Sequence, residues 1–541
     1  MTVGSDPATV EVGVAAHRQR VLQAETPAPP NFNIATACCD RWPRDRVALV
    51  DARASQSRRV TFGTLSSQSS RLANALAARS IGFGDRVLVG LPQGLEAAIT
   101  HLAIARLAAI SVPLSVMHGE EAVKARLATS GARAGVIDGE AMAWLADSDL
   151  VSEADWLVVG GPTPAPDGMS DFESVLEAGR EHHELPTITS ETPATLIFTS
   201  GTTGAAKGAL HAHRVVHAHQ APLSLLHNGF PQPHDLFWSP ADWAWAGGLI
   251  DCLFGALSSG APILAYRGRR FDPEEVVSLI ERYQVTNTFL PPTAIKMLRS
   301  ASVAPKNRLR SVMTGGETVD AGLFDWCHEN LGVYPNTAYG QTEASCIVGA
   351  SDTLPPRPGS LGMELPGSAI AVLDEDDIPV PDGTVGEICV SASSAPVFLR
   401  YWDNQEATEA KVRSGWLRTG DLGWRDEDGY LWFSSRNDDL IMSAGYRIGP
   451  TEIEACLESH PGVRAAAVVG LHDSDRGEVV AAFVEVMDEA NPDSLPSELQ
   501  DLVRTRLAPY QVPKVVEVVE ALPRTVTGKV QRAALRMRGS V

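Results

Sequence analysis

The stretch Leu196-Ile197-Phe198-Thr199-Ser200-Gly201-Thr202-Thr203-Gly204-Ala205-Ala206-Lys207-Gly208 joins a short apolar run to a loop of small and hydroxylated residues with one lysine. The apolar run is typical of a buried strand, and a helix can begin after the loop, at Ala209-Leu210-His211. Glycines let a loop turn its N–H groups toward a ligand, hydroxyls add donors, and the lysine adds positive charge. This combination indicates a phosphate-binding loop, although its spacing is not that of the usual nucleotide P-loop. A flexible surface loop is the alternative for this stretch taken alone.

Four further stretches decide between these alternatives. They follow in order as Tyr339-Gly340-Gln341-Thr342-Glu343, Thr419-Gly420-Asp421, Arg436-Asn437-Asp438-Asp439 running to Gly445-Tyr446-Arg447, and Pro523 to Lys529. Together the five stretches resemble the signatures of the adenylate-forming (AMP-binding) superfamily, and the resemblance is closest to the medium-chain acyl-CoA synthetases. It covers most of the chain and implies a ligase that uses ATP and Mg²⁺ to activate a carboxylic acid and then transfers the acyl group to CoA.

Composition sets limits on the other classes. The 541 residues are too many for one core, and 44% hydrophobic with 21% charged residues is ordinary for a globular protein. A net charge of −21 argues against a general nucleic-acid or membrane-surface binder. The most apolar long stretch, 247–266, is broken by glycine, proline and an aspartate, so we expect no membrane span. Seven scattered cysteines and the lack of a signal pattern favour reduced thiols and a cytoplasmic protein. Whether it forms a homo-oligomer is left open.

The order of apolar runs predicts the domains. Strands at 47–50, 86–90, 134–137 and 156–159 alternate with helical patterns, which favours an α/β fold with mainly parallel sheets. After residue 437 the pattern changes to that of a small α+β domain, with helices at 451–458 and 497–507 and strands at 465–470, 479–486 and 515–519. We therefore expect an N-terminal arm at 1–30, a large domain of several subdomains at 31–437 and a small mobile domain at 438–541, joined by a hinge.

The resemblance assigns roles in ATP binding. It implies that Tyr339 stacks on adenine, that Thr342 meets the α-phosphate and that Glu343 binds Mg²⁺, for which a carboxylate is a suitable ligand. Asp421 would hold the ribose hydroxyls and Arg436 the ribose or phosphate. The full set implied for ATP or AMP is Thr199, Ser200, Gly201, Thr202, Thr203, Gly204, Lys207, Gly316, Glu317, Asn336, Tyr339, Gln341, Thr342, Asp421 and Arg436. Asn336 would accept a hydrogen bond from the amine of adenine.

The resemblance also assigns the catalytic lysine, the hinge and the CoA tunnel. Lys529 would be the catalytic lysine, with Thr342 and Glu343, and Asp438 would be the hinge. A structural salt bridge is the alternative for Asp438. The CoA tunnel would be bordered by Gly445, Tyr446 and Arg447, where a side chain at 445 would obstruct it.

The acid-binding pocket is implied at Trp238, Trp243, Trp245, Gly247 and Gly340. Plain core packing is an equal alternative for the tryptophans. Acetate-activating relatives carry tryptophan at the position of Gly340, so glycine predicts room for a larger acid. The tail is expected to be apolar, and medium-length, branched or aromatic.

Two alternative functions use the same residues. A stand-alone adenylation enzyme would load an aryl or amino acid onto a carrier protein. Amino-acid-activating relatives need a carboxylate where this chain has Gly247, although Asp242 or Asp251 could replace it. A non-enzymatic binding protein would require a lost key residue. A metal site at the histidine run 211–219, where His213 and His217 would share a helix face, is disfavoured because no carboxylate or cysteine lies within the run.

Overall fold

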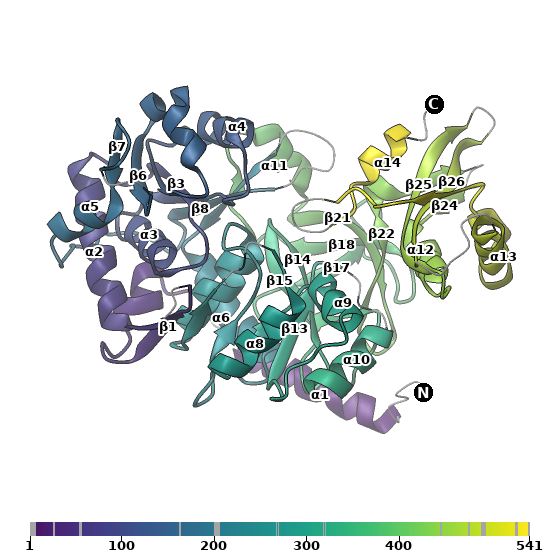
Figure 1. The fold of residues 1–541 in the computed structure, drawn as a ribbon. Coiled ribbons are helices and arrows are strands. Elements are labelled where there is room, and N and C mark those ends of the chain that lie inside the picture. Colours follow the sequence, from purple (N-terminus) through teal and green to yellow (C-terminus); the bar gives the residue numbers. More distant parts are fainter. Residues whose placement is uncertain are drawn as a thin grey trace. The chain divides into compact units, whose positions relative to one another are not determined.

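The structure is a computed structural model that describes residues 7–24, 27–53, 57–161, 164–199, 206–266, 268, 270–317, 319, 321–443, 446–473, 476–487, 494–524 and 529–538. The chain divides into two compact units (Figure 1). The first comprises residues 1–199, 207–370 and 390–417, and the second comprises mainly residues 371–389 and 418–541. The domain boundary expected at 437/438 therefore lies inside the second unit.

The first unit contains a sheet with mainly parallel strands, as the alternating pattern predicts. Its strands are, in spatial order, β19 (Arg400–Tyr401), β9 (Gly208–Ala212), β8 (Pro193–Phe198), β4 (Ile110–Pro113), β3 (Arg86–Gly90), β5 (Ala134–Asp138), β6 (Asp155–Val159) and β7 (Met169–Asp171). Strands β4, β3, β5, β6 and β7 are parallel to their neighbours, whereas β9 and β19 are antiparallel additions at one edge. The helices and short helical turns of this part are α2 (Phe62–Ala78), α3 (Leu95–Arg106), α4 (Glu120–Ser130), η2 (Ala143–Asp147), η3 (Asp149–Glu153) and α5 (Phe172–Ala178).

A second sheet of the same unit carries most of the predicted site. Part of this 14-stranded sheet is formed, in spatial order, by β16 (Ser360–Glu364), β15 (Ala344–Gly349), β14 (Asn336–Gln341), β13 (Ser311–Gly315), β12 (Asn287–Phe289), β10 (Phe237–Trp238), β11 (Ile263–Ala265), β1 (Val47–Asp51) and β2 (Arg58–Thr61). The run from β14 to β1 is parallel, and β15, β16 and β2 are antiparallel. The other elements of this unit are η1 (Thr36–Asp40), α6 (Arg214–Leu226), η4 (Gly247–Phe254), α7 (Gly255–Ser258), α8 (Pro273–Tyr283), α9 (Pro292–Ser300), α10 (Ala321–Leu331), α11 (Gln405–Lys411) and β20 (Val412–Arg413).

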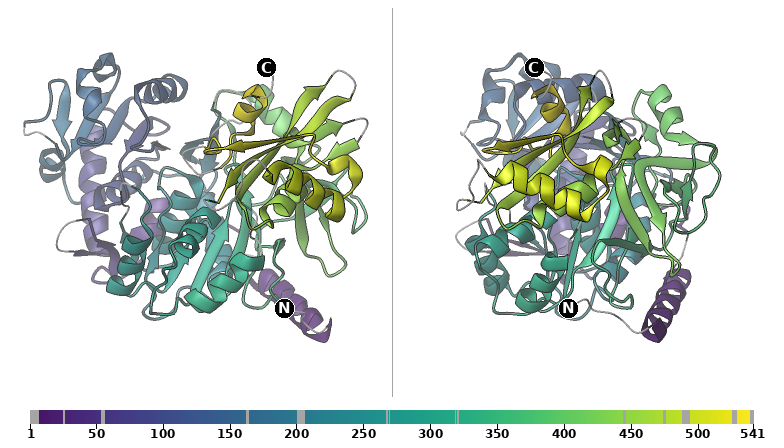
Figure 2. Two further views of the ribbon diagram at one scale, coloured as in Figure 1. Left: turned by 45° about the vertical axis from the view of Figure 1, so that its right-hand side comes forward. Right: turned by 90° about the vertical axis from the view of Figure 1, so that its right-hand side faces the viewer.

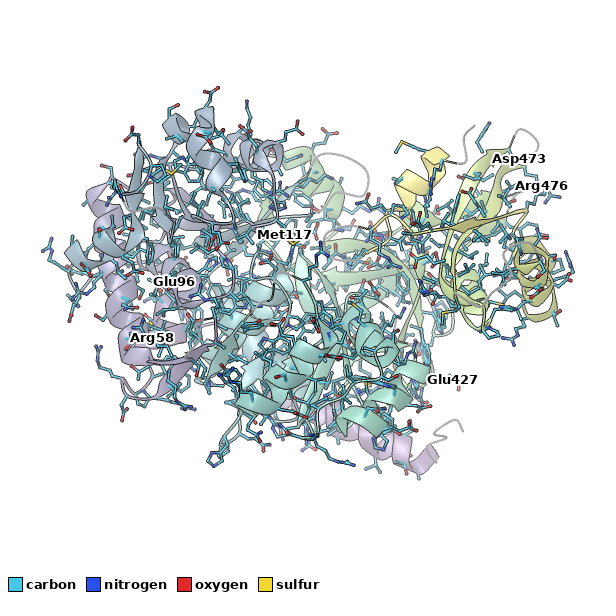
Figure 3. The ribbon with its side chains drawn as sticks, viewed as in Figure 1. Arg58, Glu96, Met117, Glu427, Asp473 and Arg476 are labelled. Atoms are coloured by element: carbon cyan, nitrogen blue, oxygen red, sulfur yellow. The ribbon has the colours of Figure 1, made fainter. Side chains whose placement is uncertain are left out.

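Side chains fill the space between these elements (Figure 3). One buried cluster joins η1, α2, α3, η4 and α7 to both sheets. At its border Glu96, labelled in Figure 3, forms an ion pair with Arg53, which also pairs with Asp51 at 2.7 Å. All seven cysteines are free and buried, in agreement with the expected reduced thiols. In the described part of the chain no helix combines the length and apolar character needed to cross a membrane.

The N-terminal arm expected at 1–30 contains a helix, α1 (Pro7–Ala24). Val10, Val14 and His17 are buried at helical spacing, so one narrow face contacts the protein. His17 bonds to the hydroxyl of Ser351 at 3.3 Å and to the carbonyl of Glu364 at 3.0 Å. Because one of the three buried positions is a histidine and not an apolar residue, the apolar pattern of this helix face is weak in the sequence.

The second unit ends in the small α+β domain that the sequence predicts (Figure 2). The elements are β17 (Ile370–Leu373), β18 (Gly386–Ser391), β21 (Trp416–Arg425), β22 (Leu431–Arg436), η5 (Asn437–Asp439), β23 (Ile441–Ser443), β24 (Tyr446–Ile448), α12 (Pro450–Glu458), β25 (Val463–Asp473), β26 (Gly477–Val486), α13 (Leu495–Arg506), η6 (Pro509–Gln511), β27 (Val515–Val519) and α14 (Arg532–Arg538). Alternate residues of β25 and β26 form two cores, one with α12 and α13 and the other with α14. The two-faced strands explain why 465–470 and 479–486 appear as continuous apolar runs.

Candidate active site

The predicted phosphate loop lies at the closed end of a β-hairpin. β8 and β9 pair antiparallel up to Phe198 and Gly208, and the N–H of Thr199 donates to the carbonyl of Lys207 at 2.9 Å. Expecting a helix at 209–211 was therefore wrong, because this segment extends the sheet as β9 and α6 begins at Arg214. Residues Ser200, Gly201, Thr202, Thr203 and Gly204 lie outside the described residues. Lys207 is exposed at the base of the loop.

The stretch from Tyr339 to Glu343 forms the tip of a second hairpin, between β14 and β15. Gln341 pairs with Ala344, so Thr342 and Glu343 make the two-residue turn. Tyr339, Gln341 and Thr342 are half-buried, whereas Glu343 is buried. The backbone carbonyl of Glu343 accepts a hydrogen bond from the N–H of Phe398 at 2.8 Å. This hydrogen bond holds the turn in place. The turn itself connects β14 and β15, which belong to the second sheet.

Two side chains from the edge of the first sheet hold this turn. His211 on β9 donates from Nε2 to the carbonyl of Thr342 at 2.8 Å. Burial lowers the pKa of His211 to about 3, so the ring is neutral and its single proton lies on the nitrogen that faces this carbonyl. Tyr401 on β19 donates its hydroxyl to the carboxylate of Glu343. The Nζ of Lys207 lies 5.4 Å from the centre of the Tyr401 ring, within the range of a cation–π contact.

These contacts bring the residues of three separate segments together. Lys207, Thr342 and Glu343 meet at Tyr401 and His211, where the edge of one sheet touches a hairpin of the other. The cation is Lys207, and the buried carboxylate belongs to Glu343 in the turn. Such groups can neutralise and orient phosphate oxygens and a divalent cation.

A small pocket lies beside this hairpin and includes Glu317, one of the residues implied for ATP or AMP. It is lined by Thr314, Gly315, Glu317, Val319, Thr337, Ala338, Gly359, Ser360 and Leu361. Thr337 lines the pocket and donates from Oγ1 to the carbonyl of Leu361 at 3.2 Å.

The amide nitrogen of Asn336 is already engaged within the protein, and its expected role toward adenine stays a prediction. Its amide nitrogen donates to the carbonyl of Leu226 at 2.8 Å and to Oδ1 of Asn228 at 2.7 Å, and the residue is buried against the end of α6. Successive side chains of a strand point to opposite faces, so the next residue, Thr337, takes the pocket side of β14.

The reason given for Gly340 also needs correction. A Cβ atom at 340 would lie 2.7 Å from the carbonyl oxygen of Ala344 and 2.7 Å from the N–H of Cys346. The space expected beside Gly340 is filled by the backbone of β15. Glycine is required here by the close approach of the two strands, and it does not by itself indicate the size of the acid.

The predicted acid-binding residues separate into two groups. Trp238 is buried in the core under α8 and α9 and donates to the carbonyl of Tyr266 at 3.1 Å, while Trp243 is buried in the first core. Both agree with the core-packing alternative. Trp245 and Gly247 are half-buried, and the edge of Trp245 meets His118.

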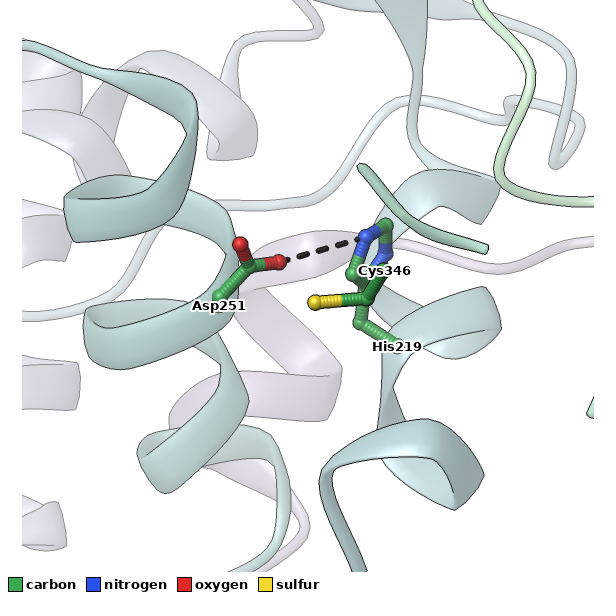
Figure 4. Close-up of side chains that lie close together, drawn as sticks. All are labelled: His219, Asp251 and Cys346. Atoms are coloured by element: carbon green, nitrogen blue, oxygen red, sulfur yellow. Dashed lines mark ion pairs between the residues drawn. The ribbon is translucent and has the colours of Figure 1, made fainter. Parts of the chain in front are cut away.

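One group of potential metal ligands occurs among the described residues, and it is not the pair His213 and His217. His219, Asp251 and Cys346 place their ligand atoms within 4.8 Å of one another in a buried position (Figure 4). Nε2 of His219 is 3.2 Å from Oδ1 of Asp251, and burial raises the pKa of the Cys346 thiol well above its usual range. These three side chains form a buried polar cluster.

The remaining nucleotide residues lie in the second unit. Asp421 and Arg436 pair across β21 and β22, with Oδ1 of Asp421 3.2 Å from a guanidinium nitrogen. The backbone N–H of Asp421 donates to Oγ1 of Thr419 at 3.0 Å, which fixes the carboxylate at the bend. Asp421 is buried, so its oxygens are presented from a rigid strand.

Lys529 is exposed at the end of a loop that is closed at its base. Arg524 and Val530 form a bridge, and the N–H of Gln531 donates to the carbonyl of Pro523 at 2.7 Å. The following helix α14 carries Arg532 and Arg536, which we call the α14 clamp.

The α14 clamp connects this helix to the segment of the predicted hinge. Arg532 binds both carboxylate oxygens of Glu454 at 2.8 Å and approaches Asp439 at 3.3 Å. Arg536 binds Asp439 at 3.0 Å. The side chain of Asp438 lies outside the described residues, so its hinge role stays a prediction.

Of the predicted CoA-tunnel residues, Tyr446 is the one whose side chain is described. It is half exposed and stacks on Tyr510, with ring centres 4.3 Å apart. Gly445 and the side chain of Arg447 lie outside the described residues.

Comparison with known proteins shows the family of the chain. The model of the family "AMP-binding enzyme" matches residues 35–402, and that of the "AMP-binding enzyme C-terminal domain" matches residues 452–529. This chain belongs to the AMP-binding enzyme family. Its relatives place it in the acyl-CoA synthetase branch, and the fold class predicted from sequence is confirmed.

Relatives of this AMP-binding enzyme cover nearly the whole chain. It is 32% identical to an uncharacterized acyl-CoA ligase YtcI of Bacillus subtilis, over 88% of this chain and 90% of that protein. It is also 32% identical to the mitochondrial acyl-coenzyme A synthetase ACSM4 of Rattus norvegicus, over 96% and 92%. Among solved structures, ATP-bound MatB from Rhodopseudomonas palustris superposes with a TM-score of 0.85 at 26% identity, over 94% of this chain and 99% of that chain.

Two residues of the site in this AMP-binding enzyme were missed from sequence. His211 was noticed as part of a histidine run, and Tyr401 carried no signal. Their partners Thr342 and Glu343 are 131 and 58 positions away. An aromatic hydroxyl on a short edge strand has no sequence pattern that links it to a distant carboxylate.

Proposed function

We propose that this protein is an ATP-dependent carboxylate–CoA ligase that forms AMP and pyrophosphate. The junction of Lys207, Tyr401 and Glu343 is the observation that carries the proposal, because it sets a cation and a buried carboxylate at the turn that contains Thr342. In the first step the carboxylate of the acid attacks the α-phosphorus of ATP, giving an acyl-adenylate and pyrophosphate. In the second step the thiol of CoA attacks the acyl carbon and AMP leaves.

Mg²⁺ fits the donor set at this junction. Tyr401 donates to one carboxylate oxygen of Glu343, and the second oxygen is the ligand atom that Glu343 offers. Bound Mg²⁺ supplies positive charge to the phosphates. The chain's own contribution is to orient: His211 fixes the carbonyl of Thr342, and the hairpin holds the Thr342 hydroxyl and Glu343 in register.

Lys207 and Lys529 supply charge where two anions must meet. Lys529 acts in adenylation and is withdrawn when the small domain turns about Asp438, which admits the thiol along Gly445, Tyr446 and Arg447. The pocket beside Glu317 and Thr337 takes adenine, with Tyr339 against its face and Gly316 and Gln341 nearby, while Asp421 and Arg436 bind the ribose. Closing and opening of this kind often limit the rate of such enzymes.

The acid is medium-length, branched or aromatic with a largely apolar tail. Phe289, Trp245 and Gly247 are half-buried around the expected position of the tail. Support also comes from a structural neighbour at 25% identity and TM-score 0.84, an anthranilate CoA ligase in complex with anthranoyl-AMP. One methylene in an apolar pocket changes selectivity by about 1–3 kcal/mol, so several acids should be accepted.

The test is mass spectrometry of the products of one pooled reaction. It contains the full chain, MgATP, CoA and equimolar acetate, isobutyrate, hexanoate, decanoate, benzoate, cinnamate and several amino acids. One or two dominant acyl-CoA thioesters support the proposal. Acyl-adenylates without thioesters would replace it with the carrier-protein adenylation enzyme, and no acid-dependent product would refute both.

A further inference from the structure

A half-buried arginine lies beside the strand that leads into the predicted phosphate loop. The guanidinium carbon of Arg126, on α4, is 5.7 Å from the centre of the Phe198 ring. Phe198 is the last residue of β8, and the N–H of the next residue, Thr199, donates to the carbonyl of Lys207. Arg126 therefore lies at the base of the loop, on a helix that none of the five sequence stretches includes.

The contacts of Arg126 show which way its side chain points. A guanidinium nitrogen donates to the carbonyl of Ala122, one turn earlier on α4, at 2.9 Å. The helix begins at Glu120, soon after β4 ends at Pro113, and β4 is parallel to β8. The start of α4 and the end of β8 therefore lie at the same edge of the sheet. The guanidinium points toward this edge, outside which ligands bind in open α/β sheets.

Arg126 lacks the partners that other half-buried arginines have. Arg214, Arg310 and Arg418 each form an ion pair with a carboxylate. Arg86 donates to three backbone carbonyls. Within the described residues, no carboxylate lies at ion-pair distance from Arg126, and burial lowers the pKa of its guanidinium. A partly buried charge without a counter-charge destabilises the protein, and an anionic ligand would remove this cost.

The ionisable side chains near Arg126 do not neutralise it. Burial and the charge of Arg126 lower the pKa of His118 to about 4, so this ring is neutral at pH 7. The carboxylate that acts on His118 is that of Asp242, which accepts a hydrogen bond from the hydroxyl of Ser115 at 2.7 Å. The ring centre of His118 is 6.2 Å from that of Trp245, one of the residues implied for the acid. Arg126 is thus near both the phosphate loop and the residues expected around the acid.

We propose that Arg126 is a second phosphate-binding cation of the ligase, and that it holds the β- or γ-phosphate of ATP. This inference rests on the proposed function and names a further residue of its ATP site. A guanidinium can donate two parallel hydrogen bonds to phosphate oxygens, which orients the phosphate chain and neutralises its charge. Lys207 and Arg126 then contribute positive charge to the same phosphate chain. AMP lacks the β- and γ-phosphates, so Arg126 distinguishes ATP from AMP.

The test measures the binding of MgATP, pyrophosphate and AMP to the full chain by calorimetry, without acid or CoA. Arg126→Met should weaken the binding of MgATP and of pyrophosphate about 10- to 100-fold, because hydrogen bonds between charged groups are lost, and should leave the affinity for AMP unchanged. Arg126→Lys keeps the charge but not the planar fork, so its loss should be smaller. The matched control is Arg282→Met on α8, where the guanidinium carbon lies 5.3 Å from the centre of the Tyr283 ring. This control should bind all three ligands like wild type.

Thermal unfolding separates this role from a structural one. Without ligand, Arg126→Met should unfold at the wild-type temperature or above it, because methionine still covers Phe198 and the unpaired charge is gone. MgATP should raise the unfolding temperature of wild type more than that of the variant. A ligand-free variant that is less stable than wild type but keeps the wild-type ratio of ATP to AMP affinity would show that Arg126 supports the fold, and would overturn the inference.

The remaining outcomes separate this inference from the proposed function. If wild type forms thioesters but Arg126→Met keeps its preference for ATP over AMP, the inference alone is overturned. A loss confined to thioester formation from synthetic acyl-adenylate and CoA would assign the guanidinium to the phosphates of CoA, and would also overturn it. If wild type forms no acid-dependent product and binds ATP no better than AMP, both proposals fail. Arg126→Lys decides the question if Arg126→Met does not fold, since an unchanged ratio of ATP to AMP affinity in this variant would overturn the inference.

Discussion

Tyr401→Phe is the substitution that tests the site most directly. The hydroxyl donates to the carboxylate of Glu343, a residue that is 7% exposed, and the ring lies 5.4 Å from Nζ of Lys207. Phenylalanine keeps the ring and its contact with the lysine but removes the only hydroxyl group on this side chain. The substitution therefore isolates one hydrogen bond to a buried carboxylate.

The size of the effect follows from that bond. A hydrogen bond to a charged group contributes about 1.5–3 kcal/mol, and about 1.4 kcal/mol corresponds to a factor of ten. If the bond holds Glu343 for Mg²⁺ during adenylation, kcat/KM for acid-dependent pyrophosphate release should fall about 10- to 100-fold. Thioester formation from synthetic acyl-adenylate and CoA should change less than threefold, roughly, since the phosphate chain has already left.

A matched control removes the same kind of bond elsewhere. Tyr266 donates its hydroxyl to Glu275 on α8, and Tyr266→Phe should leave both half-reactions at the wild-type rate. Equal losses of both half-reactions in Tyr401→Phe would mean that the hydroxyl supports the fold and not adenylation. An unchanged rate of pyrophosphate release would refute the role given to Tyr401 altogether.

Three further predictions concern catalysis, packing and pH. Lys529→Ala should slow adenylation about 10²–10³-fold and spare thioester formation from preformed adenylate; an equal loss in both half-reactions would contradict the assigned role. Gly248→Ala should lower the free energy of unfolding by about 3 kcal/mol in urea titration, because its Cβ atom would overlap the carbonyl of Asp242, whereas equal stability would show that the helix adapts. Burial lowers the pKa of His101 and of His227 to about 3, while the unfolded chain takes up these protons near pH 6.5. Acid therefore favours the unfolded state, and each ring should cost about 2 kcal/mol of stability on going to pH 5. His101→Asn should lose less stability between pH 7 and pH 5 than wild type; the same loss would refute this account.

The sequence predicted the local elements well because their patterns are local. The apolar runs at 86–90 and 134–137 became β3 and β5, and the runs after 437 became the two-faced strands of the small domain. It was wrong where long-range pairing decides the outcome. The segment 208–212 can be helical by composition, but β8 offers it an antiparallel partner and the strand wins.

The site shows the same division. Lys207, Thr342 and Glu343 were found because their motifs are continuous, whereas His211 and Tyr401 reach them through contacts between two sheets. Asn336 and Thr337 are neighbours on β14, and one residue on a strand reverses the face to which a side chain points, which a sequence motif does not specify. Gly340 had a structural reason, the close approach of β15, that only coordinates reveal.

The α14 clamp has a mechanical consequence. Arg532 and Arg536 tie Asp439, the neighbour of the predicted hinge residue, to the helix that follows Lys529, and Arg532 also neutralises Glu454, whose pKa is raised by burial. These ion pairs are partly buried and act together on one short helix, so they restrain its motion relative to Asp439. If the chain rotates at Asp438, the ion pairs of Arg532 and Arg536 transmit the rotation to the segment that carries Lys529. The rotation at Asp438 would then set the position of Lys529, and free motion of the lysine side chain would matter less.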